Sequence, residues 1–222
     1  MFPVRDAVPV RIRPIVTLVT IAITVVVFCA ARLVFPADEV RMAAAHTGVV
    51  PAELSWLAFV TSLAWPIGWL QLIAGAWCLA IFGPTVEDRL GHARFAILYL
   101  LSGAAGALTV VWAHPASFTP ICGPAGAMAG IVGAHFALYP RGRVLMLVPM
   151  VTGFECVDVP SLLVSGLWLM LELAGSLAPG LYAPGWLPSM TVLQLAGGLF
   201  AGAIAGRILR RADRMRVEWW NG

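Results

Sequence analysis

Residues 95–113 read FAILYLLSGAAGALTVVWA and contain no charged side chain. A helix of about 20 apolar residues is long enough to cross the roughly 30 Å hydrocarbon core of a bilayer. Inside that core a helix satisfies all of its backbone hydrogen bonds internally, whereas irregular backbone cannot. The stretch therefore predicts a transmembrane helix.

The same pattern recurs on both sides of this stretch. The fourth of the six apolar stretches is short, which a span buried among its neighbours can tolerate. We predict an all-α membrane protein with six transmembrane helices that form one domain over residues 1–222. The six predicted spans are residues 14–34, 63–82, 95–113, 124–139, 160–178 and 190–209.

The composition agrees with a membrane protein and excludes a water-soluble globule. Hydrophobic residues make up 60% of the chain and charged residues only 11%, and the mean hydropathy is +0.90. A soluble domain carries roughly a quarter charged residues. Membrane lipid is therefore the expected surrounding of most of the surface. We interpret residues 14–34 as a retained span, because no small-residue cleavage site precedes the polar segment near Asp38.

The arginines predict the orientation of the spans. With an N-terminus in the cytoplasm and six spans, only Arg32 and Arg41 fall outside. Basic residues concentrate on the cytoplasmic side of membrane proteins, so we predict that both termini are cytoplasmic. The arginines placed inside are Arg5, Arg11, Arg13, Arg89, Arg94, Arg141, Arg143, Arg207, Arg210, Arg211, Arg214 and Arg216.

Two connecting segments are neither fully polar nor long enough to span. Residues 35–62 mix charged residues with Trp, Pro and apolar side chains, which favours an external loop that lies partly in the membrane interface. Residues 144–159 contain the apolar run VLMLVPMV followed by Glu155 and Asp158. We expect this second segment to be a partly embedded cytoplasmic hairpin or an amphipathic helix.

Glycines recur at steps of four in the fourth and sixth spans. Gly126 and Gly130 share one helix face, and so do Gly198, Gly202 and Gly206. Such faces let the backbones of two membrane helices approach closely. We predict that the fourth and sixth spans pack tightly, most simply against each other.

Several function classes find no support in the chain. No basic run is interleaved with aromatic residues, so we predict no nucleic-acid partner. Four widely separated cysteines (Cys29, Cys78, Cys122 and Cys156) give no metal-binding or disulfide pattern, and we expect no metal and no cofactor. A transporter or channel would need several ionisable residues at mid-membrane depth, and only Glu172 qualifies.

Three polar residues within the spans allow two interpretations. Glu172 is either a contact for a client helix or a partner in a hydrogen bond between helices. Gln71 and Gln194 are able to link helices by hydrogen bonds, and Gln194 is a second candidate client contact.

One segment carries a family resemblance. IFGPTVEDRLGHARFAILYLLSG, residues 81–103, resembles the signature of the rhomboid intramembrane serine proteases, including Gly83, Glu87, Arg89 and Gly91. Residues 1–14 (MFPVRDAVPVRIRP), 48–54 (GVVPAEL) and 159–168 (VPSLLVSGLW) resemble bacterial rhomboid proteins as well. We interpret the four signature residues as a tight cytoplasmic turn in which Glu87 accepts backbone or arginine hydrogen bonds.

The resemblance also locates the residues that would carry catalysis. Rhomboids use a serine on the fourth span and a histidine on the sixth, with a histidine and an asparagine on the second span at the oxyanion hole. The corresponding motifs here are GPAG (123–126), LAGG (195–198) and QLIAG (71–75). They place Ala125 and Leu195 at the nucleophile and the base, and Gln71 and Gly75 at the oxyanion hole. A shift of one residue in the sixth span would substitute Gln194 for Leu195, which is still no base.

These replacements predict a non-catalytic rhomboid. Methyl and isobutyl groups can neither attack a carbonyl nor accept a proton. We expect a pseudoprotease that binds or escorts transmembrane segments of other proteins. The alternative is a rhomboid serine protease with a non-standard site.

A non-standard site would need other residues. A pair of His114 and Cys122 is one candidate. His46 is expected in the first external loop and His92 on the cytoplasmic side, and His135 is expected to be a helix-end or packing residue. The exclusive use of arginine, with abundant Ala, Gly and Val, favours a multi-pass protein of a bacterial cytoplasmic (inner) membrane.

Overall fold

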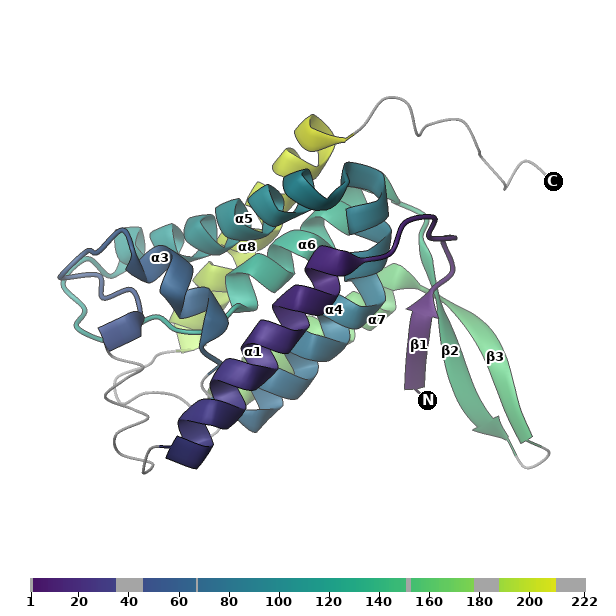
Figure 1. The fold of residues 1–222 in the computed structure, drawn as a ribbon, viewed down its shortest axis with the longest axis horizontal. Coiled ribbons are helices and arrows are strands. Elements are labelled where there is room, and N and C mark those ends of the chain that lie inside the picture. Colours follow the sequence, from purple (N-terminus) through teal and green to yellow (C-terminus); the bar gives the residue numbers. More distant parts are fainter. Residues whose placement is uncertain (1, 35–45, 67, 151–152, 178–187, 211–222) are drawn as a thin grey trace.

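A computed structural model describes residues 2–34, 46–66, 68–150, 153–177 and 188–210. Six long helices form a bundle, and a three-stranded antiparallel sheet lies at one end of it (Figure 1). The helices are α1 (Ile15–Val34), α4 (Trp69–Leu90), α5 (His92–Ala113), α6 (Ala125–Leu138), α7 (Ser161–Leu177) and α8 (Pro188–Leu209). Two short elements, α3 (Ala58–Thr61) and the 3-10 helix η1 (Ser62–Ala64), precede α4.

Each predicted span corresponds to one of these helices. Four of them, α1, α4, α5 and α8, are long and apolar enough to cross a membrane, whereas α6 and α7 are shorter apolar helices. The helical character of the bundle is thus confirmed, and the count of six spans stays a prediction.

The predicted bounds of the second span, residues 63–82, lie too close to the N-terminus. The helix begins at Trp69 and continues through Pro84 to Leu90. A proline inside a membrane helix is tolerated when neighbouring groups satisfy the freed carbonyl. The predicted turn from Gly83 to Gly91 is therefore wrong in its extent. The turn is confined to Gly91, whose φ of 84° lies in the left-handed region that glycine adopts without strain.

The central helix of the bundle is α6. Residues 125–135 of this helix are all buried, and it contacts α4, α5, α7 and α8. Its 14 residues extend over about 21 Å, which is less than the hydrocarbon thickness. Because its neighbours separate it from lipid, the short length carries no penalty, as the sequence predicted.

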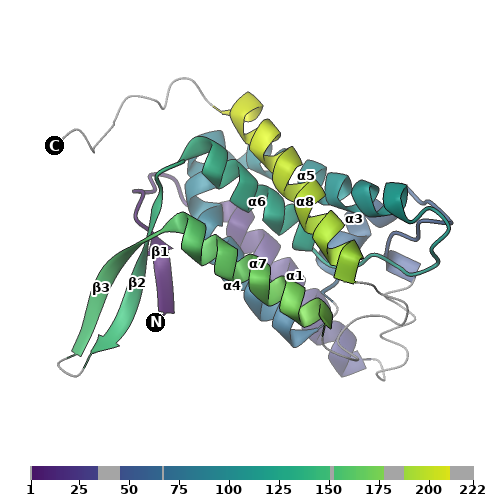
Figure 2. The same cartoon turned by 180° about the vertical axis from the view of Figure 1, so that it is seen from behind.

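Glycine faces hold α6 against α8. A methyl group added to Gly198 or Gly202 would overlap the backbone of Gly126 or Gly130, respectively, and one added to Gly206 would lie 2.8 Å from Cβ of Ala134. The two backbones are therefore in direct contact along three turns. The predicted packing of the fourth and sixth spans is confirmed. Figure 2 shows α7 and α8 on the side of the molecule opposite α1.

The sheet contains β1 (Phe2–Asp6), β2 (Arg143–Met150) and β3 (Gly153–Pro160) in that order. β2 and β3 form a hairpin whose ends pair Arg143 with Pro160 and Met150 with Gly153. Of the two structures predicted for residues 144–159, the hairpin is the one observed. The sequence did not predict that β1 would join it, so the all-α class describes the bundle and not the whole chain.

The arginine-bearing helix ends lie together at one end of the bundle. The start of α1 contacts the end of α4, and Arg94 at the start of α5 donates to the carbonyl oxygen of Leu209 at 3.0 Å. The sheet lies at this same end (Figure 1). This arrangement agrees with the predicted positive side of the protein, while the orientation in a membrane stays a prediction.

Candidate functional site

The four positions that the rhomboid resemblance assigns to catalysis, Ala125, Leu195, Gln71 and Gly75, are called here the degenerate site. They lie on three helices: Ala125 opens α6, Leu195 lies in α8, and Gln71 and Gly75 lie one turn apart near the start of α4. All four are buried. They belong to the bundle end opposite the sheet, where the chain enters α4, α6 and α8.

Gly123, two residues before α6, is the point on which two glutamines converge. Its φ of 93° is left-handed, and its N–H donates to the carbonyl oxygen of Ser62 at 2.9 Å. A side chain here would meet Gln71, since an added Cβ would lie 2.5 Å from Oε1 of that residue. From α8, Gln194 Nε2 approaches the Gly123 carbonyl oxygen at 3.4 Å. Gln194 thus links α8 to the loop before α6. This agrees with the prediction that Gln194 forms a hydrogen bond between elements of the bundle.

Met128 occupies the space beside Gly75. An added Cβ at Gly75 would lie 2.5 Å from the terminal methyl carbon of Met128 and 2.6 Å from its sulfur. Met128 lies one turn after Ala125 on α6, and both belong to one apolar cluster with Leu195. Met128 was not among the predicted site residues. Its i+3 relation to Ala125 was the signal that places both on neighbouring turns of one helix face.

The chemistry available at the degenerate site is limited to amides and apolar groups. The amides of Gln71 and Gln194 can donate and accept hydrogen bonds but cannot act as a base near neutral pH. Ala125 is 1% exposed and Leu195 is 7% exposed. The arrangement is therefore suited to packing and hydrogen bonding and offers no nucleophile–base pair.

The four histidines occupy different places. His46 is exposed and His114 is half-buried. His92 Nδ1 lies 2.6 Å from Oε1 of Glu87, and His135 Nε2 lies 2.6 Å from Oδ2 of Asp6. The expectation that His135 is a helix-end residue is confirmed, because it anchors β1 to the end of α6. Within the described ranges, no three His, Cys, Asp or Glu side chains are grouped so that they could hold a metal ion.

Cys122 is buried directly before the loop that carries Gly123, and its burial raises the pKa of the thiol to about 12. The thiolate is the reactive form of cysteine. At pH 8 we expect iodoacetamide to modify Cys122 about a thousandfold more slowly than it modifies an ordinary cysteine. Peptide mapping by mass spectrometry over time measures this rate, with the SDS-unfolded protein as the control. Equal rates in the folded and unfolded protein would make Cys122 a credible nucleophile.

Glu172 lies in α7 and is 3% exposed. It is within electrostatic range of Cys78 on α4, so it faces the neighbouring helix. Its Oε1 has no hydrogen-bond partner among the residues that the structure describes. The same is true of Nε1 of Trp168, one turn earlier on the same helix. Two buried side chains on neighbouring turns of α7, which packs against α4, thus each keep one hydrogen-bonding atom without a partner among the described residues.

The signature residues of the α4–α5 connection form a structural anchor. Glu87 is fully buried and accepts the N–H groups of Val16 and Thr17, each at 2.8 Å, and the Thr17 hydroxyl at 2.6 Å. Gly83 permits this approach, because an added Cβ would lie 2.6 Å from Thr17 Cγ2. The prediction that Glu87 accepts backbone hydrogen bonds is confirmed. These bonds satisfy the first N–H groups of α1, which otherwise lack acceptors.

Comparison with known proteins agrees with this architecture. A family model for the Rhomboid domain matches residues 53–212. The chain belongs to the rhomboid family. Together with its apolar helices, this makes it an integral membrane protein. The structure thus has the helices of a rhomboid domain around a site whose assigned positions are Ala, Leu, Gln and Gly.

Two curated rhomboid relatives match parts of the chain. "Rhomboid protein 1, mitochondrial" of Saccharomyces cerevisiae is 34% identical over 76 residues, which cover 32% of this chain and 22% of the relative. YdcA of Bacillus subtilis, also named for the rhomboid family, is 28% identical over 90 residues, which cover 40% of this chain and 44% of the relative. The matched segments span less than half the length of either relative.

Proposed function

We propose that this rhomboid protein binds transmembrane segments of other membrane proteins and does not cleave them. The observation that carries the proposal is Ala125. This residue opens α6 where the resemblance places the nucleophilic serine, and its methyl group is buried in an apolar cluster. A peptide bond has nothing to react with at this position.

The neighbouring residues support the same conclusion. Leu195 supplies no proton acceptor, and the space at Gly75 is filled by Met128. Loss of one oxyanion-hole donor alone reduces a rate by about 10²–10³. Catalytic residues act as a unit, so a chain that lacks the nucleophile and the base retains only background acceleration.

The α4–α7 interface is the proposed contact with a client helix. A carboxyl group at the bilayer centre costs about 2.5–3.5 kcal/mol on insertion scales, and such residues mark functional sites by default. Glu172 and Trp168 each keep a hydrogen-bonding atom unused within the described residues. Both side chains are buried, so a client helix with a polar side chain would satisfy them by entering between α4 and α7. Gln194 is already directed to Gly123, so Glu172 is the stronger of the two candidate contacts.

The membrane arrangement completes the proposal. We place six spans in a bacterial cytoplasmic membrane, with both termini and the sheet in the cytoplasm. The gathering of arginine-bearing helix ends beside the sheet supports this orientation. The hairpin of β2 and β3 would then lie at the cytoplasmic surface.

A proteoliposome cleavage assay tests the loss of catalysis. We expect the natural chain to leave a permissive transmembrane substrate uncleaved above the protein-free background. The comparison variant carries Ala125→Ser and Leu195→His, with Gln71→His, Gly75→Asn and Met128→Ala to make room beside position 75. Cleavage by this variant alone would support a scaffold that still admits a helix. Cleavage by the natural chain would overturn the proposal.

Photo-crosslinking in native membranes tests client binding. A photoreactive residue at Leu173, next to Glu172, should capture a membrane protein, and Glu172→Gln should reduce that capture. The matched control places the same residue at Trp112, which lies in α5 and is 86% exposed. Capture that is equal at both positions, or absent from both, would contradict a specific client site.

A further inference from the structure

A pocket separates α1 from α5 beneath the α3–η1 segment. Its volume is about 220 Å³. Apolar side chains make up most of its wall, among them Ile23 of α1, Leu63 of η1 and Leu100 of α5. None of its lining residues belongs to the degenerate site, to α4 or to α7.

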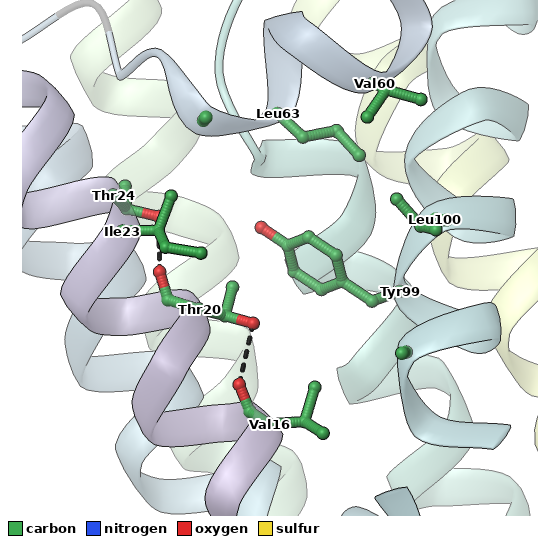
Figure 3. A pocket seen from close by; sticks show the side chains of 10 residues that line it. Val16, Thr20, Ile23, Thr24, Val60, Leu63, Tyr99 and Leu100 are labelled. Carbon is green, nitrogen blue, oxygen red and sulfur yellow. Dashed lines mark hydrogen bonds between the residues drawn. The ribbon is translucent and has the colours of Figure 1, made fainter. Parts of the chain in front are cut away.

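One polar group points into this apolar space. Tyr99 of α5 is only 7% exposed, and its hydroxyl has no hydrogen-bond partner among the residues that the structure describes. Figure 3 shows the hydroxyl directed from the ring into the gap between α1 and Leu63. An unmade hydrogen bond at a buried hydroxyl is costly. The hydroxyl oxygens of Thr20 and Thr24 belong to the pocket wall, but no described residue makes a hydrogen bond with the Tyr99 hydroxyl.

The hydroxyl groups of the two threonines opposite Tyr99 already donate hydrogen bonds within α1. Thr20 donates its hydroxyl hydrogen to the Val16 carbonyl oxygen and Thr24 donates to that of Thr20, each at 2.8 Å. Figure 3 shows both bonds along α1. The pocket thus presents one available O–H donor, from Tyr99, in apolar surroundings. A single carbonyl oxygen on an apolar molecule is the complementary group.

The ligand must also be uncharged and must enter from lipid. No charged side chain belongs to the pocket wall, so an ionised head group would be buried without a partner. Ile23, Val60 and Leu100 line the pocket and are also 49%, 55% and 42% exposed, respectively, on the outer face of the bundle. In a membrane these exposed parts face acyl chains, which gives a lipid a direct entry.

Two other occupants fit the pocket less well. One turn of a helix that is about 10–12 Å wide occupies about 400–600 Å³, which is more than the pocket volume of about 220 Å³. Water needs two to four polar partners for each molecule; the wall is apolar except for the hydroxyls of Thr20, Thr24 and Tyr99, so water would fill only the part beside them. We propose that the pocket binds a neutral glycerolipid of the diacylglycerol type, with an acyl chain against the apolar wall and an ester carbonyl accepting from Tyr99. This site is independent of client binding.

The test uses the full chain in phosphatidylcholine liposomes with a diacylglycerol that carries a diazirine in one acyl chain. We expect photolabel on the peptides that contain Thr20–Thr24 and Ala96–Leu100. Unlabelled diacylglycerol should compete for this labelling, whereas additional phosphatidylcholine with the same chains should not. Tyr99→Phe should lower the labelling about three- to tenfold, because it removes one hydrogen bond and little volume.

Two variants keep the test decisive. Ala96→Leu fills the pocket from α5 and should remove the competable label even where Tyr99 is intact. Tyr139→Phe makes the same chemical change after the end of α6 and should leave the label unchanged. Label spread evenly over the lipid-exposed helices, competition by phosphatidylcholine, or equal labelling of Tyr99→Phe and the natural chain would each overturn the proposal.

Discussion

Replacement of Gly202 by alanine should separate α6 from α8 and destabilise the protein by about 3 kcal/mol or more. The added methyl group would overlap the Gly130 carbonyl group, and this neighbour is backbone that has no rotamer with which to move aside. Because α6 is central, the displacement would reach its contacts with α4 and α5. Far-UV circular dichroism during SDS titration in mixed micelles measures the loss.

Gly166 provides the matched control for this substitution. It lies in α7 with nothing within 4 Å of an added Cβ. Alanine is a better helix former than glycine by about 1 kcal/mol, so Gly166→Ala should be neutral or slightly stabilising. If Gly202→Ala and Gly166→Ala unfold at the same SDS fraction, the close contact of the α6 and α8 backbones is not a determinant of stability.

Replacement of Glu87 by alanine should cost about 4 kcal/mol and release the start of α1 from α4. Two backbone N–H groups and the Thr17 hydroxyl would lose their acceptor in a buried site. Each unsatisfied buried donor costs about 1–3 kcal/mol. The same SDS titration measures the overall loss, and hydrogen exchange at Val16 and Thr17 locates it.

Asp88 is the comparison residue for Glu87. It is half-buried and accepts the N–H groups of Arg11 and Ile12 at 3.1 and 2.9 Å. Water can replace a partly exposed acceptor, so Asp88→Ala should cost only about 1 kcal/mol. A smaller effect at Glu87 than at Asp88 would show that burial of the anchor does not determine its contribution.

Gly202 and Glu87 belong to the scaffold and not to the positions that the resemblance assigns to catalysis. The glycine contacts of α6 and α8 and the Glu87 anchor hold the helices in place without any catalytic group. A fold shared with proteases does not establish proteolysis, since activity depends on the residues of the site. In the proposed function, this helical scaffold holds a membrane helix without cleaving it.

Much of this architecture follows from local sequence patterns. Apolar length locates a helix such as Phe95–Ala113 because lipid requires every backbone group to be satisfied within the segment. Glycines at steps of four, such as Gly198 and Gly202, indicate a face for close helix packing. The identity of residue 125 limits the chemistry whatever surrounds it, because a methyl group has no reactive atom.

Other features depend on residues that are distant in the chain, and no local pattern contains them. Glu87 looked like part of a turn, but its carboxylate caps α1, whose start is 71 residues away. The strand β1 pairs with β2, and Asp6 meets His135 across 129 residues. Met128 fills the space at Gly75 only because α4 and α6 pack side by side. Capping, strand pairing and cavity filling require a partner, and only the tertiary arrangement of the helices supplies it.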